Sequence, residues 1–445
     1  MALCIFVDDI AIMNRSILRL AIPSIISNIS IPLLGMVDLA LVGHLENVHY
    51  IGAVALGSMI FNVIYWGFGF LRMGTSGFTA QTYGARDLKG SLLILSRAAL
   101  VGMAGGLLMI LLQKPIGMLS FLLIRGTEEV EILARQYFYI RIWAAPATIG
   151  LYALTGWFIG MQNTRFPMII TIFVNLLNIG FNFLFVLGYD MKSDGVALGT
   201  VLAQYSGLIL ALALYWRYYR KLNKFWSLEG MMEAKAFKLF LHVNKDILIR
   251  TLFLIFAFTF FTAVSARAGD DFLAINTLLL QYFMFFSYLI DGFAYAAEAL
   301  VGRYTGAASQ TQLRKVIRRL FFWGAATSIP FSLTYLAGGE FILGLLTNNE
   351  RLMALASDFM IYVYLIPIIT FPAFLLDGIY IGATASVGMR NTMIVSTLVF
   401  YLPVYYLLIG PLGNHGLWLA FLSFMIGRGG LMALGLKKAV YRGGG

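Results

Sequence analysis

Twelve long apolar stretches constrain this chain more than any other feature. Few charged residues interrupt them, and they lie at 17–44, 51–82, 91–113, 132–160, 166–188, 195–217, 247–267, 272–304, 316–337, 354–383, 392–411 and 415–436. A helix needs roughly 20 apolar residues to cross a bilayer, and lipid offers the backbone no hydrogen-bond partners. The pattern therefore predicts an all-α polytopic membrane protein with twelve transmembrane helices.

The composition supports this fold class. Of the 445 residues, 60% are apolar and only 12% are charged, and the mean hydropathy is +0.83. So little charge cannot cover a water-facing surface, which excludes a soluble enzyme and a disordered chain. A single cysteine, Cys4, excludes internal disulfides. Because the apolar start lacks basic residues and a cleavage site, we expect no signal peptide.

Basic residues set the expected orientation. Most of the 32 lysines and arginines lie at one set of span ends, which the positive-inside rule assigns to the cytoplasm. We therefore expect both termini in the cytoplasm, and we attribute the net charge of +11 to these loops rather than to nucleic-acid binding. The predicted organisation is an N-lobe at 1–217, a cytoplasmic linker at 218–246 and a C-lobe at 247–445.

The two halves resemble each other at a nearly constant spacing. Leu154-Thr-Gly-Trp-Phe-Ile-Gly160 recurs as Leu376-Asp-Gly-Ile-Tyr-Ile-Gly382, and Gly84-Ala85 recurs at the same spacing as Gly306-Ala307. Six helices per half start both halves on the same side of the membrane. The repeat is therefore parallel, with its axis along the membrane normal. Two six-helix bundles of this kind predict an alternating-access transporter rather than a channel.

Ionisable residues inside the spans are functional candidates, because a charge in lipid is energetically expensive. They are Asp38, Arg72, Arg141, Arg250, Asp291, Glu298, Asp377 and Arg428. Asp38 stands out because its stretch holds no nearby cation. A carboxyl without such a partner can load and release a proton in each transport cycle, so we predict that Asp38 couples transport to an ion. The alternative is that Asp38 only packs against neighbouring helices.

Polar residues of the fifth and sixth stretches are expected to complete this site. Asn178 and Asn182 are four residues apart and share a helix face. With Thr200 they are suitable ligands for a carboxylate network or a hard cation. Asn175 and Gln204 are predicted substrate contacts. The alternative is that these side chains only join helices to one another.

The first two stretches carry further predicted roles. Met36, Asn62 and Trp66 are predicted substrate contacts, because methionine and aromatic walls adapt to flat lipophilic cations. Pro23 and Pro32 free backbone carbonyls and permit a kink, which makes them candidates for a conformational switch.

Three acids lie in spans of the second half, namely Asp291, Glu298 and Asp377. They form either a second cation site or ion pairs with arginines. The arginines that could serve as partners are Arg250, Arg303 and Arg428. We find no nucleophile arrangement, metal-ligand spacing or P-loop pattern, so we expect no enzyme activity, no metal and no other cofactor.

Several motifs resemble the DinF branch of the MATE (multidrug and toxic compound extrusion) transporters. They include Leu33-Leu-Gly-Met-Val-Asp38, Phe70-Leu-Arg-Met73, Asp291-Gly-Phe-Ala-Tyr295 and Gly413-Asn-His-Gly-Leu-Trp418, and together they cover nearly the whole chain. The resemblance implies two six-helix lobes that export drugs in exchange for protons or sodium.

The resemblance also implies a pattern of site residues. Relatives of this branch pair an acid on the first helix with an Asn, and an Asp four residues later, on the fifth helix and with a Thr on the sixth. Asp38, Asn178 and Thr200 match this pattern, whereas Asn182 stands where the second acid is expected. One carboxylate in place of two favours proton coupling over tight sodium binding.

We therefore expect a monomeric antiporter of a bacterial inner membrane. It would expel small lipophilic, cationic drugs in exchange for protons, with sodium as the other candidate ion and membrane lipid as its other partner. The alternative is a flippase of lipid-linked precursors, which has a similar architecture and needs a basic central cleft. Arg72, Arg141 and Arg250 are the residues that test this alternative.

Overall fold

The computed structural model describes the backbone of residues 2–43, 48–124 and 126–441 and the side chains of residues 10–37, 49–124 and 126–441. Within this part, all regular structure is helical, and 12 segments are long and apolar enough to cross a membrane. Each of the predicted stretches overlaps one of these segments. The prediction of an all-α protein with twelve spans is confirmed.

The helices pack into two compact units. The N-terminal unit comprises Ile26–His242, and the C-terminal unit comprises Met1–Ile25 together with Val243–Gly445. Two long helices, α1 (Ala2–Gly43) and α10 (Ala234–Ala268), contribute to both units because the boundaries fall inside them. The lobe boundaries expected at 217 and 247 stay a prediction.

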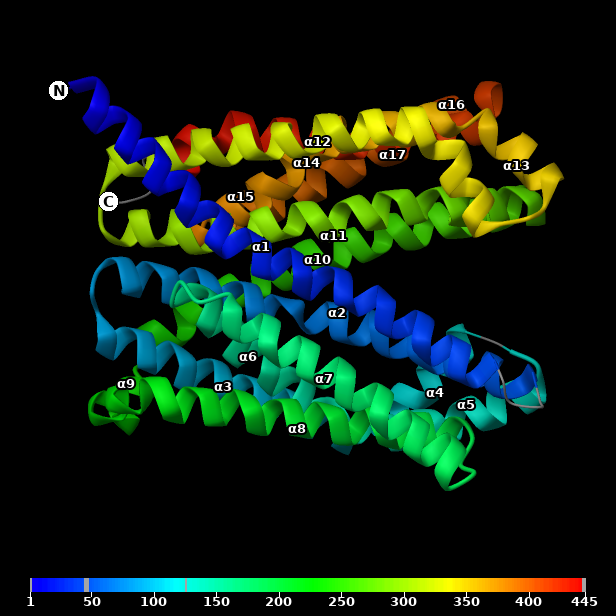
Figure 1. Cartoon of the computed structure of the whole chain (residues 1–445), viewed down its shortest axis with the longest axis horizontal. Coiled ribbons are helices and arrows are strands. Elements are labelled where there is room, and N and C mark those ends of the chain that lie inside the picture. The colour runs from blue at the N-terminus through cyan, green and yellow to red at the C-terminus, as the bar shows by residue number, and fades with distance from the viewer. Residues whose placement is uncertain (1, 44–47, 125, 442–445) are drawn as a thin grey trace. The chain divides into compact units, whose positions relative to one another are not determined.

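The helices of the N-terminal unit run side by side, with α6 packed against both α2 and α3 and with α7 packed against α8 (Figure 1). Their bounds are α2 (Val48–Gly84), α3 (Leu88–Leu111), α4 (Gln113–Leu123), α5 (Glu128–Arg141), α6 (Ala145–Gly160), α7 (Arg165–Phe183), α8 (Ser193–Tyr219) and α9 (Leu228–Met231).

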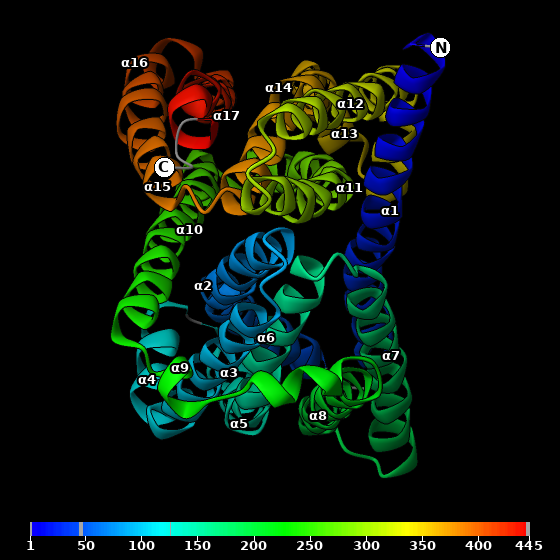
Figure 2. The ribbon, with the colours of Figure 1, turned by 90° about the vertical axis from the view of Figure 1, so that its left-hand side faces the viewer.

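The C-terminal unit repeats this arrangement, with α14 packed against both α11 and α12 and with α16 packed against α17; Figure 2 views these helices nearly end-on. Their bounds are α11 (Asp270–Gly306), α12 (Gln310–Leu346), α13 (Glu350–Ser357), α14 (Met360–Gly382), α15 (Ser386–Val395), α16 (Leu402–Leu412) and α17 (Asn414–Leu436).

Prolines account for two irregular turns within spans. A 3₁₀ turn at Ile142–Ala144 separates α5 from α6 just before Pro146, and a π-helical turn at Ser396–Tyr401 separates α15 from α16 just before Pro403. Proline lacks the N–H that an α-helix needs, so the chain locally tightens or widens its hydrogen-bond pattern.

The sequence repeat coincides with a repeat in how the helix backbones pack against each other. A Cβ at Gly156 of α6 would lie 2.4 Å from the carbonyl oxygen of Arg72 in α2, and a Cβ at Gly378 of α14 would lie 2.3 Å from that of Ala294 in α11. Gly378 is the repeat equivalent of Gly156, and Ala294 is the repeat equivalent of Arg72. Small residues let membrane helices approach closely, and here they do so at equivalent places in the two units.

Helix ends repeat in the same way. Arg86 and Gln162 have positive φ angles of 58° and 62°, and Ala308 and Thr384, at the equivalent positions of the second half, have φ angles of 51°. In each case the following N–H bonds to a carbonyl five residues back, which is a left-handed helix stop. The turn positions, like the glycines, follow the parallel repeat.

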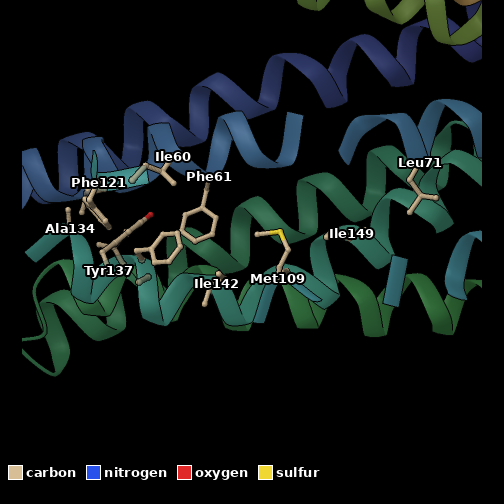
Figure 3. Close-up of a cluster of buried hydrophobic side chains, with 14 of the residues drawn as sticks. Ile60, Phe61, Leu71, Met109, Phe121, Ala134, Tyr137, Ile142 and Ile149 are labelled. Atoms are coloured by element: carbon tan, nitrogen blue, oxygen red, sulfur yellow. The ribbon is translucent and has the colours of Figure 1, made fainter. Parts of the chain in front are cut away.

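An aromatic cluster forms the core of the N-terminal unit where α2 meets α5 (Figure 3). The ring of Phe61 stacks on Phe138 at 5.2 Å, and Phe121 meets the same ring edge-on at 6.0 Å. Phe61 is fully buried. Its aromatic ring therefore supports the fold and does not form part of an exposed wall.

Candidate functional site

Three of the predicted site residues form one hydrogen-bonded chain between α7 and α8. The side-chain amide of Asn182 donates to the Oδ1 atom of Asn178 at 3.0 Å, and that of Asn178 donates to the Thr200 hydroxyl at 3.0 Å. The hydroxyl in turn donates to the Val196 carbonyl at 2.9 Å. Asn178 and Asn182 are both buried. The chain is electrically neutral and holds the two helices in register.

A glycine of α8 makes room for this chain. A Cβ at Gly199 would lie 2.2 Å from the Oδ1 atom of Asn182. Only a residue without a side chain lets the buried amide approach the backbone of α8 this closely. The arrangement of Asn178, Asn182 and Thr200 therefore depends on a fourth residue that the sequence did not indicate.

Asn175 connects the same helix to α1. Its amide donates to the Ser30 carbonyl at 3.1 Å and to the Ser30 hydroxyl at 3.0 Å. Ser30 lies two residues before Pro32, in the second half of α1. α7 thus bonds to α1 through Asn175 and to α8 through Asn178, which brings three helices of the predicted site together. A substrate contact at Asn175 stays a prediction.

Asp38 lies in α1, but its side chain is outside the described part of the structure. Pro23 and Pro32 both lie within this continuous helix. The boundary between the compact units falls between Ile25 and Ile26, and therefore between the two prolines. The role of Pro23 and Pro32 in a conformational switch stays a prediction.

The other predicted substrate contacts are accessible. Met36 is 65% exposed and Trp66 is 38% exposed. Asn62 is also exposed, and Gln204 lies half-buried one turn after Thr200 on α8. Their roles as substrate contacts stay a prediction.

The C-terminal unit holds a buried cluster of charges. Arg250 of α10 and Arg428 of α17 both donate to the Oδ2 atom of Asp377 in α14. All three side chains are less than one-tenth exposed. Burying an unpaired ion costs several kcal/mol, so the pairing is what makes the cluster possible. The sequence left a cation site and ion pairing open for Asp377, and the geometry is that of ion pairing.

Two further acids lie on α11. Asp291 is half-buried and interacts electrostatically with Arg428. Glu298 is buried, with 2% of its surface exposed. α11 packs against α14, the helix of Asp377, so both acids belong to the same densely packed part of the C-terminal unit.

The two remaining arginines within spans differ from this cluster. Arg141 donates to the Ser58 hydroxyl at 2.9 Å and to the Tyr137 hydroxyl, and its guanidinium lies 5.1 Å from the centre of the Phe61 ring. It therefore bridges α5 to α2 through neutral groups and aromatic faces. Arg72 is half-buried at the glycine contact between α2 and α6.

One buried acid was missed by the sequence analysis. Asp246 is fully buried near the start of the C-terminal unit, where it accepts hydrogen bonds from Arg390 at 2.6 Å and from the Ser386 hydroxyl at 2.9 Å. The sequence analysis assigns Asp246 to the polar linker. The sequence could have indicated its burial, because Asp246 directly precedes Ile247 and lies three residues after Val243, and both are apolar. Among the described residues, no group of three or more His, Cys, Asp or Glu side chains could hold a metal ion.

Comparison with known proteins now decides the family. The MatE family model matches residues 23–184 and again residues 247–407. The chain belongs to the MatE family. The two matches follow the internal repeat, with one in each half of the chain.

The DinF resemblance is also confirmed. The chain is 38% identical to DNA damage-inducible protein F of Escherichia coli over 94% of this chain and 90% of that protein. It is 27% identical to the human protein named multidrug and toxin extrusion protein 1, over 77% of this chain and 60% of that protein. The MatE proteins are transporters, and this chain is accordingly a membrane transporter rather than an enzyme.

Solved MATE structures share the fold. A Vibrio cholerae MATE transporter in its bent form has a TM-score of 0.86, at 18% identity over 98% of this chain and 99% of that chain. A eukaryotic MATE transporter has a TM-score of 0.84, at 16% identity over 98% of this chain and 99% of that chain. The expected fold of two six-helix bundles related by a parallel repeat is therefore confirmed.

Proposed function

We propose that this MatE-family transporter exports lipophilic, cationic compounds across a bacterial inner membrane in exchange for protons, with Asp38 as the coupling carboxylate. The observation that carries the proposal is the unequal use of acids in the two units. Asp377, the acid of α14, is committed to Arg250 and Arg428. The groups that α7 and α8 supply to the predicted site in the N-terminal unit are amides and a hydroxyl, which carry no charge.

A neutral setting suits a proton-coupling acid. Deprotonated Asp38 would attract a cationic drug, and protonation would remove that attraction and release the drug. Asn178 and Asn182 are uncharged amides, so they add no second carboxylate to attract a sodium ion. We therefore expect protons rather than sodium to drive export. Both termini and the linker would face the cytoplasm, because that end of the spans holds most of the basic residues.

The test is ethidium efflux from proteoliposomes driven separately by a pH gradient and by a sodium gradient. Wild type should export on the pH gradient alone. Asp38→Asn should fold and insert normally but lose this efflux, because the side chain can no longer release a proton. Asp190→Asn is the matched control, since Asp190 is exposed beside Lys192 outside the predicted site.

Three outcomes would contradict the proposal. Efflux by Asp38→Asn at the wild-type rate would show that this carboxyl is not the coupling group. Efflux by wild type on the sodium gradient alone would move coupling to a cation site that includes Asn178, Asn182 and Thr200. If neither gradient drives efflux, transport of a lipid-linked precursor becomes the next hypothesis to test.

A further inference from the structure

A cavity of about 540 Å³ lies on the side of the N-terminal unit, among α3, α6, α8 and the linker. It is lined by Leu95 and Met103 of α3, Gly150 of α6, Leu212 of α8 and Trp226 of the linker. The walls are almost entirely apolar. Met103, Leu212 and Trp226 are each about half exposed, so the cavity opens onto the apolar outer surface of the unit. In a membrane that surface faces lipid tails.

Arg97 of α3 holds the linker next to the cavity. Arg97 of α3 is buried, and its guanidinium donates to the Gly230 carbonyl at 2.6 Å and to the Met231 carbonyl at 3.0 Å. These two carbonyls belong to α9, so Arg97 fixes the short helix against α3. The linker segment before α9 contributes Asn223 and Trp226 to the lining of the cavity.

A second contact fixes the polar rim. The Tyr215 hydroxyl donates to the Asn223 side chain, and both residues line the cavity. Asn223 belongs to the 3₁₀ turn Arg220–Phe225, which joins the end of α8 to the linker. In a 3₁₀ helix, residues three apart are eclipsed, so Arg220 stands on the same side of the turn as Asn223.

The rim is basic. Arg217, Arg220, Lys221 and Lys224 lie within or beside this turn, and each is at least partly accessible. The acids of the segment are Glu229 and Glu233, and Glu233 interacts electrostatically with Arg97 of α3. Aromatic side chains at this level, such as Trp226, are typical of the boundary between lipid tails and headgroups. Through Asn223 and Trp226, the apolar cavity thus adjoins a segment that carries accessible cations and aromatic rings.

We propose that this cavity binds an anionic glycerophospholipid from the leaflet at the linker end of the spans. One acyl chain would lie among α3, α6 and α8, and the phosphate would lie against the basic turn. Charge complementarity selects this occupant, because a zwitterionic headgroup would gain less from the accessible cations of the rim. The linker between the two repeats would then be held by lipid as well as by Arg97.

Native mass spectrometry of the purified full-length protein tests the proposal directly, with no transport step. Phosphatidylglycerol and phosphatidylcholine with the same acyl chains are titrated in turn. Phosphatidylglycerol should bind more tightly. Replacing both Arg220 and Lys224 with Gln should weaken its binding by roughly tenfold or more, because each lost charge contributes on the order of fivefold. Binding of phosphatidylcholine should stay nearly unchanged.

Filling the cavity tests the acyl-chain part. Ala99 lines the cavity and is exposed, so Ala99→Phe should reduce binding of both lipids without disturbing the fold. Ala213→Phe, at an exposed position of α8 that is not among the lining residues, is its control. Lys235→Gln with Lys238→Gln is the control for the charge variant. Thermal unfolding of each variant verifies that it is folded.

Several results would overturn the proposal. Equal binding of the two lipids, or unchanged binding in Ala99→Phe, would show that the cavity does not select an anionic phospholipid. Displacement of phosphatidylglycerol by glycerol 3-phosphate would show that the rim binds a soluble phosphate without the chain. Displacement by ethidium at transport concentrations would show that the cavity is a drug site.

Discussion

The two repeats make the same backbone contact and surround it with different chemistry. In the N-terminal unit, Gly156 packs against Arg72, and in the C-terminal unit Gly378 packs against Ala294. The residue before each glycine differs between the units. Thr155 donates to a carbonyl of its own helix at 2.7 Å, whereas Asp377 binds two arginines from other helices.

A second pair of equivalent positions shows the same divergence. Gly195 and Gly416 correspond in the repeat, and their spacing places Phe421 at the position of Thr200. Thr200 accepts a hydrogen bond from Asn178. Phe421 is fully buried among aromatic rings, with those of Phe261 and Phe283 at 5.5 and 5.4 Å. One unit has a polar chain where the other has an aromatic core.

The comparison shows which positions the repeat can change. A glycine at a close helix contact cannot gain a side chain without moving the backbone, and Gly156 and Gly378 keep this role at equivalent positions of the two units. Side chains that point between helices can change if their neighbours change with them. The C-terminal unit uses this freedom to neutralise its acid, and the N-terminal unit uses it to build an uncharged hydrogen-bonded chain.

The largest expected effect of a substitution is at Asp377, whose equivalent in the N-terminal unit is Thr155. Asp377→Leu leaves Arg250 and Arg428 buried without their shared carboxylate, and it should lower the free energy of unfolding by about 3–5 kcal/mol. Thr155→Val, at the equivalent position, removes one hydrogen bond within a helix and should cost less than about 1 kcal/mol. Denaturation in detergent micelles measures both.

A rescue variant separates lost pairing from lost volume. Adding Arg250→Met and Arg428→Met to Asp377→Leu removes all three charges of the cluster, so the triple variant should regain most of the lost stability. If Asp377→Leu alone were as stable as wild type, the ion pairs would not hold the C-terminal unit together.

The glycines should respond alike in both units. Gly156→Ala and Gly378→Ala place a Cβ within 2.4 Å of a backbone oxygen, so helices must separate at a cost of about 1–3 kcal/mol. Gly180→Ala and Gly430→Ala have open space around the new methyl group and should be neutral or slightly stabilising. Thermal unfolding compares the four. A cost in one unit only would mean that the repeat is not equivalent in packing.

The smallest expected effect concerns the polar chain. Thr200→Val removes the acceptor of the Asn178 amide and should lower the free energy of unfolding by about 0.6–1.7 kcal/mol, the range typical of bonds between membrane helices. Thr155→Val is the control, because its hydroxyl bonds only within its own helix. Equal losses in the two variants would show that the link between α7 and α8 contributes nothing beyond helix propensity.

Much of the fold was predictable because hydropathy and backbone sterics act locally. The twelve spans follow from apolar stretches, and the repeat follows from glycines and helix stops at a fixed spacing. The site was predictable only in part. Asn178, Asn182 and Thr200, which the sequence analysis grouped, are joined by hydrogen bonds, and their role in ion coupling stays a prediction. Gly199 and Asp246 were missed, because their importance comes from neighbours that the sequence does not place beside them.

The sequence by itself determined that this protein is a twelve-span MatE transporter with two parallel repeats. The tertiary structure decided which buried charges are paired. Arg250, Asp377 and Arg428 come from three helices far apart along the chain, and an ion pair depends on separations of a few ångströms that no spacing rule supplies. The same reason applies to the linker, which lines part of the apolar cavity and is joined to α3 by the hydrogen bonds of Arg97 to Gly230 and Met231.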